Sequence, residues 1–174
     1  MFNTRSKTYI FLVDHNLDFL NSIKKSIEHP EVYEIFNFTS GERFIAYLNE
    51  KSFRKNDVLI VFLGYQFLDE GNQTLMNGIE ILEATKVINK NIEVVMLSGE
   101  NEGEFGAYVM KSGAHSFIPK NENIHLRINN IIMSIISKKR LEYNRHAFNI
   151  ALRILLVYIL IIIIIGTFYT LVLT

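Results

Sequence analysis

The feature that most constrains this chain is an uncharged segment at its C-terminal end. Ile154 to Thr174 reads ILLVYILIIIIIGTFYTLVLT and contains no charged residue over 21 positions. As an α-helix this segment would be about 31 Å long, which matches the hydrocarbon thickness of a bilayer. A single segment in lipid must satisfy its own backbone hydrogen bonds, and it can do so only as a helix. We therefore predict a transmembrane helix over 154–174.

A buried core helix or a buried strand can have a composition similar to that of this segment. The run Ile161–Ile165 would favour a strand in water, because β-branched side chains suit a pleated sheet. A core helix of this length usually carries a polar face, however, and this segment has none. Tyr158 and Tyr169 are suited to the two membrane interfaces, and Arg153 can extend its side chain to the headgroups.

Basic residues gather directly before the predicted span. Five of the 18 Lys and Arg residues lie there with a single acid, Glu142, and we call these five the membrane collar: Lys138, Lys139, Arg140, Arg145 and Arg153. Positive charge stays on the cytoplasmic side of a membrane. The N-terminus, MFNTRSK, has no apolar core of a signal peptide. These features predict a single-pass, tail-anchored membrane protein whose N-terminal domain is cytoplasmic.

Composition excludes several classes of function. Residues 1–137 carry a net charge of −4, which gives no reason to expect nucleic-acid binding. The chain has no Cys, which rules out a disulfide framework, a thiolate zinc site and a Cys nucleophile. Apart from His15, its His residues, at 29, 115, 125 and 146, lack metal-ligand spacing. Without a phosphate-binding loop or paired catalytic carboxylates, we expect no enzyme activity, no cofactor and no bound metal.

Before the span, short apolar runs alternate with amphipathic segments. This order predicts an α/β fold with a five-stranded, parallel, doubly wound sheet of flavodoxin type. The predicted strands are 9–13, 32–38, 58–63, 92–97 and 116–118, and the predicted helices are 17–28, a segment capped by Thr39 and Glu42, 79–88, 102–111 and 122–137. The chain then divides into a domain over 1–137, a basic juxtamembrane helix over 138–153 and the span over 154–174. Whether the last helix continues into the span is left open.

In such a fold the chemistry gathers where the strands end. Asp14 and His15 follow the first strand, and Gly64, Ser98 and Lys120 mark the ends of the third, fourth and fifth. With the strings FLVDHN, TSGERF, MNGIEIL, VMLSG and MKSGAHSFIPKNE, this set resembles the receiver domain of two-component response regulators over residues 8–137. MNGIEIL and the KNE string are most similar to receivers of Bacteroidota.

The resemblance implies phosphoryl transfer to an aspartate at the end of the third strand. Magnesium, held by that aspartate and an acidic pair after the first strand, would neutralise the phosphate oxygens. Here Asp14 matches the first member of the acidic pair, but His15 replaces the second, and imidazole is a poor ligand for magnesium. Gly64 stands at the phosphoacceptor position, and no Asp or Glu occurs from Val58 to Leu68.

Other parts of the family pattern remain. Ser98 and Lys120 match the hydroxyl and lysine that bind the phosphoryl group, and Phe117 matches the aromatic residue that signals activation. The usual Lys-Pro is reversed as Pro119-Lys120, which puts the expected cis peptide in doubt.

Each retained residue also has a structural interpretation. Asp14 can pair with Lys120 or bond the next helix, Ser98 can bond the following loop, and Phe117 can simply be packed. Asp69 is a displaced alternative acceptor within the polar segment 65–77.

The sequence therefore predicts a pseudo-receiver that cannot be phosphorylated and acts by binding proteins. It would be a regulatory subunit of a membrane assembly for secretion, motility or signalling. Its partners would be the lipid bilayer, other proteins of the complex and possible further copies of itself. The candidate contacts are the surface of the fourth helix, fifth strand and fifth helix (Glu104, Tyr108, Lys111, Phe117, Lys120) and the segment 65–77. The alternative function is an active membrane-anchored response regulator that uses Asp69.

Overall fold

In the computed structural model, which describes residues 6–67, 76–99 and 104–173, strands and helices alternate as expected for an α/β fold. The side chains of Glu104 and of most residues after Ile162 lie outside this description. The strands are β1 (Thr8–Val13), β2 (Glu34–Phe38), β3 (Val58–Gly64), β4 (Glu93–Ser98) and β5 (Ser116–Pro119). The helices are α1 (Leu17–Ser26), the short 3-10 helix η1 (Pro30–Val32), α2 (Gly41–Glu50), α3 (Gly78–Ile88), α4 (Glu104–Lys111) and α5 (Ile124–Leu173).

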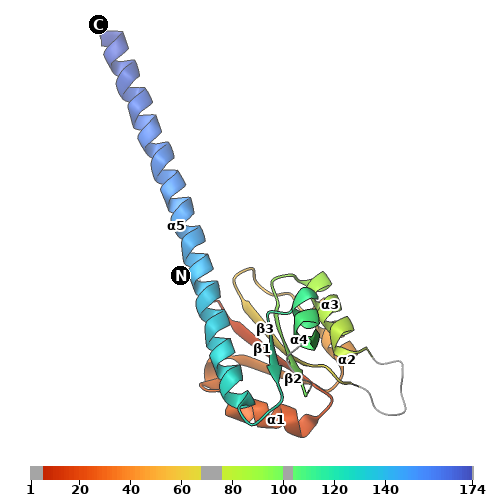
Figure 1. The fold of residues 1–174 in the computed structure, drawn as a ribbon. Helices are drawn as coiled ribbons and strands as arrows, with labels where there is room; N and C mark the ends of the chain where they lie inside the picture. Colours follow the sequence, from red (N-terminus) through yellow and green to blue (C-terminus); the bar gives the residue numbers. More distant parts are fainter. Residues whose placement is uncertain (1–5, 68–75, 100–103, 174) are drawn as a thin grey trace. The chain divides into compact units, whose positions relative to one another are not determined.

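The five strands form one parallel sheet in the order β2-β1-β3-β4-β5 (Figure 1). β3 is central and buried at all seven positions, because helices cover both faces of the sheet. On one face α2, α3 and α4 pack through residues such as Phe44, Leu82 and Val109. On the other face α1 and the first part of α5 pack through Ile23 and Ile128. The predicted doubly wound sheet of flavodoxin type is therefore confirmed.

Three predicted boundaries in the N-terminal half are wrong. The first helix ends at Ser26, two residues earlier than predicted. Val32 was expected in the second strand, but it ends η1, where its amide donates to the His29 carbonyl at 3.1 Å. Pro30 starts this turn because its ring fixes φ at a helical value. Thr39 was expected to cap the second helix, but Ser40 is the N-cap, and its hydroxyl accepts from the amide of Arg43 at 3.3 Å.

The carboxylate of Glu42, expected in that capping box, serves another purpose. It accepts from the Ser40 hydroxyl at 2.6 Å and from the amide of Met76 at 2.9 Å. Burial raises the pKa of Glu42, but these two hydrogen bonds and one from its own backbone amide together outweigh burial and lower the pKa below its ordinary value. A complete capping box occurs instead at α3, between Asn77 and Glu80. Glu42 therefore links α2 to the segment that leads into α3.

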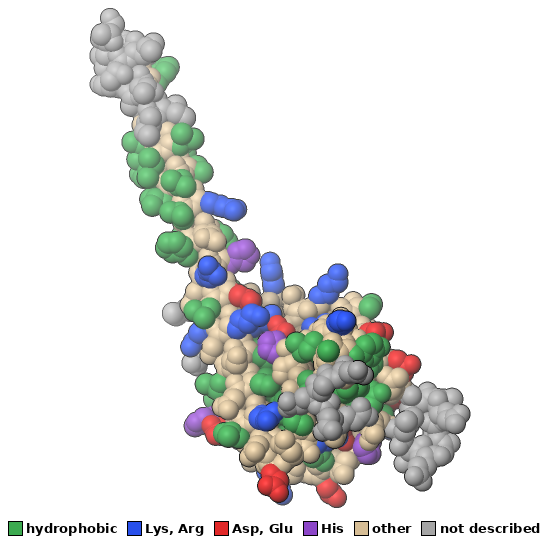
Figure 2. Space-filling model, viewed as in Figure 1, with side chains coloured by type: hydrophobic (Ala, Val, Ile, Leu, Met, Phe, Trp, Pro, Cys, Tyr) green, Lys and Arg blue, Asp and Glu red, His purple; other side chains and the backbone are tan. Residues whose placement is uncertain are grey.

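The chain divides within α5 into two compact units, residues 1–136 and 137–174, and each is described by itself. In the second unit every described side chain is exposed, apart from the half-buried Lys139. Among the described residues one helix is long and apolar enough to cross a membrane, and its apolar window is not buried. Hydrophobic side chains surround this part of α5 in Figure 2. The structure thus contains one long apolar helix that could span a bilayer.

Candidate functional site

The carboxyl edge of the sheet brings together residues from the ends of four strands, β1, β3, β4 and β5. β1 pairs with β3 in a register that places Val13 opposite Leu63, so Asp14 and Gly64 emerge side by side. β4 pairs with β5 with Ser98 opposite Pro119, and the amide of Lys120 donates to the Ser98 carbonyl at 2.8 Å. Parallel strands end at a common edge, which is why residues up to 106 positions apart meet here.

Asp14 is the centre of this site. Its side chain is fully buried, and its Oδ2 accepts from Nζ of Lys120 at 2.6 Å. Its Oδ1 accepts from the amide of Asn16 at 3.0 Å. A buried carboxylate requires such partners, since an unpaired charge in the interior is costly. The pairing with Lys120, one of the structural alternatives from the sequence, is present.

Gly64 leaves the space that this carboxylate fills. A Cβ atom at Gly64 would overlap Oδ2 of Asp14 and lie 2.9 Å from its Cγ. From the other side, α3 approaches so closely that a Cβ atom at Gly78 would lie 2.6 Å from the Gly64 carbonyl oxygen. No side chain of any kind fits at position 64 while Asp14 stays where it is. The glycine at position 64 and the placement of the Asp14 carboxylate therefore depend on each other.

His15 is exposed and turns toward the segment after β3. Its Nδ1 lies 2.7 Å from the carbonyl oxygen of Gln66 and 3.4 Å from Oδ1 of Asp14. Because a carbonyl oxygen only accepts, Nδ1 must carry the hydrogen, and the ring donates to Gln66. An N–H donor here occupies a carbonyl oxygen that a hard cation would otherwise prefer as a ligand.

These residues do not suit the magnesium ion that the receiver family uses. Asp14 is the only carboxylate at the site among the described residues, and both of its oxygens already accept hydrogen bonds. Within the same residues no group of three or more His, Asp or Glu side chains could hold a metal. Magnesium requires several oxygen ligands, and neither Lys120 nor the Nδ1–H of His15 supplies one.

The remaining sequence candidates lie close by with structural roles. Ser98 is buried at the end of β4. Phe117 is half-buried on β5 and packs edge-on against Phe105 of α4, with ring centroids 5.8 Å apart. Phe105 in turn packs against Tyr65, at 4.5 Å between centroids. This aromatic row connects the end of β3 to α4 and β5. No peptide bond among the described residues is cis, including the one before Pro119.

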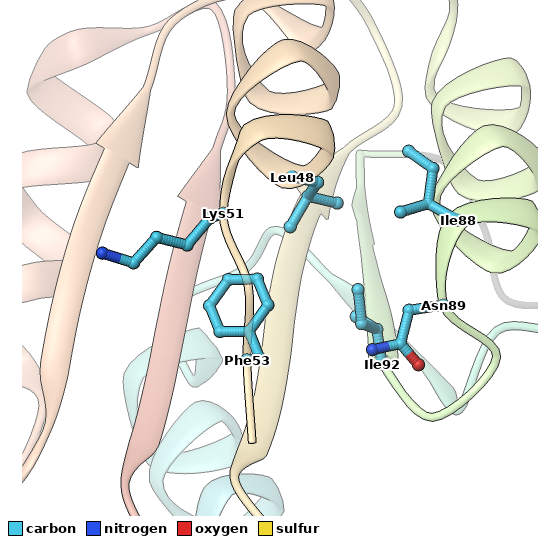
Figure 3. Close-up of a pocket in the computed structure, with 6 residues that line it drawn as sticks. All are labelled: Leu48, Lys51, Phe53, Ile88, Asn89 and Ile92. Carbon is cyan, nitrogen blue, oxygen red and sulfur yellow. The ribbon is translucent and has the colours of Figure 1, made fainter. Parts of the chain in front are cut away.

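Two groups of sequence candidates are not among the residues described above. Asp69 lies outside the described residues, as does most of the segment 65–77. The membrane collar lies on α5 beyond the first unit of the chain. A separate pocket of mixed polar and apolar lining occurs near the amino ends of the strands (Figure 3). It is lined by Leu48, Lys51, Phe53, Ile88, Asn89 and Ile92. It contains no acidic residue and belongs to the opposite edge of the sheet.

Sequence reasoning missed three participants. Asn16 and Gln66 contribute backbone groups, which leave no signal in residue type. Phe19 places its ring 4.6 Å from Nζ of Lys120, a cation–π contact that fixes the lysine from the α1 side. The aromatic residue five positions after Asp14 was visible in the sequence, but its partner lies about a hundred positions away.

Known structures share this fold. A CheY-like response regulator receiver domain from Methanospirillum hungatei JF-1 is 21% identical, with 79% of this chain and 99% of that chain covered and a TM-score of 0.63. The receiver domain of NtrX from Brucella abortus is 22% identical, with 74% and 98% covered and a TM-score of 0.60. DrrB of Thermotoga maritima is 18% identical, with 76% and 54% covered and a TM-score of 0.62. At these identities the likeness establishes the fold alone.

No curated protein matches the chain in sequence. The family model for the response regulator receiver domain, however, matches residues 10–131, which is well over half of the chain. Receiver domains are regulatory modules rather than catalysts. The match contains the whole carboxyl edge, from Asp14 to Lys120, and extends into α5. The chain therefore belongs to the response regulator receiver domain family, and it carries in addition an apolar helix that could span a membrane.

Proposed function

We propose that this protein is a pseudo-receiver, anchored in the bacterial cytoplasmic membrane, that acts by binding other proteins and not by accepting a phosphoryl group. The observation that carries the proposal is the Asp14 carboxylate, which fills the space beside Gly64 and pairs with Lys120. A receiver needs a carboxylate at the end of β3 to form an acyl phosphate. This chain has glycine there and no acid from Val58 to Leu68.

The environment of Asp14 argues against its acting as a substitute acceptor. Its side chain is fully buried, so an incoming phosphate donor has no direct access to it. Attack on phosphorus would also require a free carboxylate oxygen and a cation to neutralise the phosphate oxygens. Both oxygens of Asp14 hold hydrogen bonds instead, and His15 is a poor magnesium ligand.

The membrane part of the proposal rests on α5 and the membrane collar. The collar residues precede the apolar segment, and positive residues stay on the cytoplasmic side. This arrangement favours a receiver domain on the cytoplasmic face, where the other components of bacterial signalling complexes would reach it.

Partner binding is proposed for the surface formed by α4, β5 and α5. Tyr108 is 54% exposed on α4, and Lys111 beside it is exposed as well. Phe117 lies beneath this surface, against Phe105. Large exposed aromatic side chains are enriched where proteins bind one another. We propose that a protein of a membrane assembly binds here.

Phosphorylation is the decisive test. Full-length protein in mild detergent is incubated with acetyl phosphate and magnesium, and its intact mass is measured. The expected result is no gain of mass. A gain of one phosphoryl group, lost in Asp69→Asn, would support the alternative of an active receiver with a displaced acceptor. A gain that persists in Asp69→Asn and disappears in Asp14→Asn would equally overturn the proposal.

A second experiment tests the binding role. The full-length protein and its Tyr108→Glu variant are purified from the native membrane in mild detergent, and the proteins that accompany each are compared. A companion that is lost with Tyr108→Glu, but kept with the exposed control Glu83→Gln on α3, is the expected result. A protein without companions in every case would contradict the assembly role.

A further inference from the structure

The helical segment between the receiver domain and the apolar span has an exposed hydrophobic side. Its large apolar residues are between 45% and 67% exposed, namely Leu141, Tyr143, Phe148, Ile150 and Leu152. Exposed apolar side chains that gather on one surface mark an interaction site. This surface therefore needs a partner that covers it.

Divided into heptads, this segment has a mixed seam, in which two positions are polar and the later ones are small or apolar. If 140, 144, 147, 151, 154 and 158 are taken as the seam, at alternating steps of four and three, bulky apolar residues lie along both sides of it. These flanking residues are Leu141, Tyr143, Phe148, Ile150, Leu155 and Val157. The outer positions then receive nearly all the polar residues, namely Lys138, Lys139, Glu142, Arg145, His146, Asn149 and Arg153. Leu152 and, within the apolar span, Leu156 are the apolar residues at outer positions.

The seam itself suits two helices of the same kind. Ala147 and Ala151 allow close approach of the backbones, and Asn144 offers an amide that can bond its own counterpart. Arg140, at the first seam position, has a side chain long enough to reach water. Four of the five collar residues lie on the outer side, so two copies would keep most of their positive charge apart.

The membrane makes a second copy the natural occupant. This inference rests on the proposed function, because it assumes that 154–174 spans the bilayer. Residues 138–153 would then extend about 22 Å out of the hydrocarbon at 1.5 Å per residue. No Gly or Pro occurs from Ser137 to Ile165, so nothing in the sequence provides the kink that would lay this segment on the lipid surface. A parallel copy, anchored at the same depth, presents the same face at the same height.

We propose that residues 140–158 associate with the same residues of a second copy, as a parallel coiled coil that continues into the membrane. The receiver domains would thereby be held as a pair on the cytoplasmic face. Such pairing multiplies weak contacts of each receiver with a partner, because the second contact becomes intramolecular.

The test uses disulfide cross-linking, for which this chain is well suited because it has no cysteine. Single-cysteine variants of the full-length protein are reconstituted into phosphatidylcholine vesicles and oxidised with copper phenanthroline. Ala147→Cys and Ala151→Cys probe the seam, and His146→Cys and Asn149→Cys are matched controls on the outer side. A disulfide needs Cβ atoms within roughly 4.5 Å of each other, so only facing positions react well. We expect covalent dimers at the two seam positions and background yield at the controls.

A second comparison separates specific pairing from collision. Phe148→Glu is introduced beside Ala151→Cys, with Asn149→Glu as its neighbour on the outer side. The expected result is loss of cross-linking to background with Phe148→Glu and retention with Asn149→Glu. Equal yields at seam and control positions, or yields at the seam that vanish when the vesicles are diluted with excess lipid, would overturn the coiled coil. A helix lying on the membrane surface would give background yield at all four positions.

The same vesicles keep this inference distinct from the proposed function. Acetyl phosphate and magnesium are added, and intact mass is recorded alongside cross-linking. Seam cross-links with a gain of phosphate would preserve the coiled coil and overturn the pseudo-receiver. If neither seam cross-links nor a gain of phosphate is seen, the coiled coil alone is overturned.

Discussion

The two units of this chain differ in how far their apolar side chains are exposed. Within residues 1–136 most apolar side chains of the strands and of the inner helix faces are buried, although a few on the outer helix faces, such as Tyr108, are exposed. The charge of the buried Asp14 is compensated by Lys120. Within residues 137–174 the described apolar side chains are exposed. The first unit therefore carries its own folding energy, whereas the second depends on lipid or on another protein to cover it. Substitutions in the two units should consequently have different effects.

The largest effect is expected from breaking the ion pair in the first unit. Lys120→Ala leaves the fully buried Asp14 carboxylate without its cation, which should cost about 3–5 kcal/mol of unfolding free energy. The control is Lys7→Ala, which breaks the exposed pair with Glu34 and should cost less than about 1 kcal/mol. Urea denaturation of the full chain in detergent, followed by tyrosine near-UV circular dichroism, measures both. Equal losses would mean that Asp14 is not buried with its charge.

A direct comparison of the two units comes next. Ile128→Ala removes a fully buried side chain from the packing of α5 on the sheet and should cost about 2–5 kcal/mol. Phe148→Ala removes a side chain that is 67% exposed in the second unit and should leave the unfolding of the receiver domain unchanged. The same denaturation curves give both values. A large loss with Phe148→Ala would show that the second unit stabilises the first.

The space beside Asp14 can be probed with a single methyl group. Gly64→Ala places a Cβ atom against the Asp14 carboxylate and should cost about 1–3 kcal/mol. Gly99→Ala is the control, since a Cβ atom there meets nothing within 4 Å, and it should change stability by less than about 0.5 kcal/mol. Thermal unfolding of the two variants measures the difference. If Gly64→Ala is tolerated as well as Gly99→Ala, the Asp14 carboxylate does not fill the space beside Gly64.

The smallest effect concerns Glu42, whose pKa is lowered in the folded protein. Its contribution to stability is present above the unfolded pKa of glutamate, and it is lost as the pH falls through the lower folded pKa. Glu42→Gln should therefore flatten the acid side of the stability–pH profile by well under about 1 kcal/mol. Glu83→Gln, at an exposed position on α3, is the matched control for the loss of one carboxylate. A profile for Glu42→Gln that matches wild type would mean that the bonds to Ser40 and Met76 do not form in solution.

Local patterns were sufficient to predict the fold. Apolar runs such as 58–63 and 92–97 predicted buried strands, and the structure has β3 and β4 there within one residue. Errors occurred where neighbouring residues compete for the same role. Thr39 and Ser40 are both good helix caps, and the residue types do not distinguish them. In the structure the hydroxyl of Ser40 accepts from the amide of Arg43, so Ser40 is the cap. The Pro30 turn likewise displaced the start of β2.

The sequence by itself determined that position 64 is a glycine, that a histidine follows Asp14, and that a charge-free segment follows a basic collar. These are properties of residue type and order, which need no partner in space. Only the tertiary structure decided that Asp14 enters the space beside Gly64, bonds Lys120, and leaves His15 to donate to Gln66. The reason is that such contacts join positions up to 106 residues apart, and their geometry depends on how closely the strand ends and α3 approach one another.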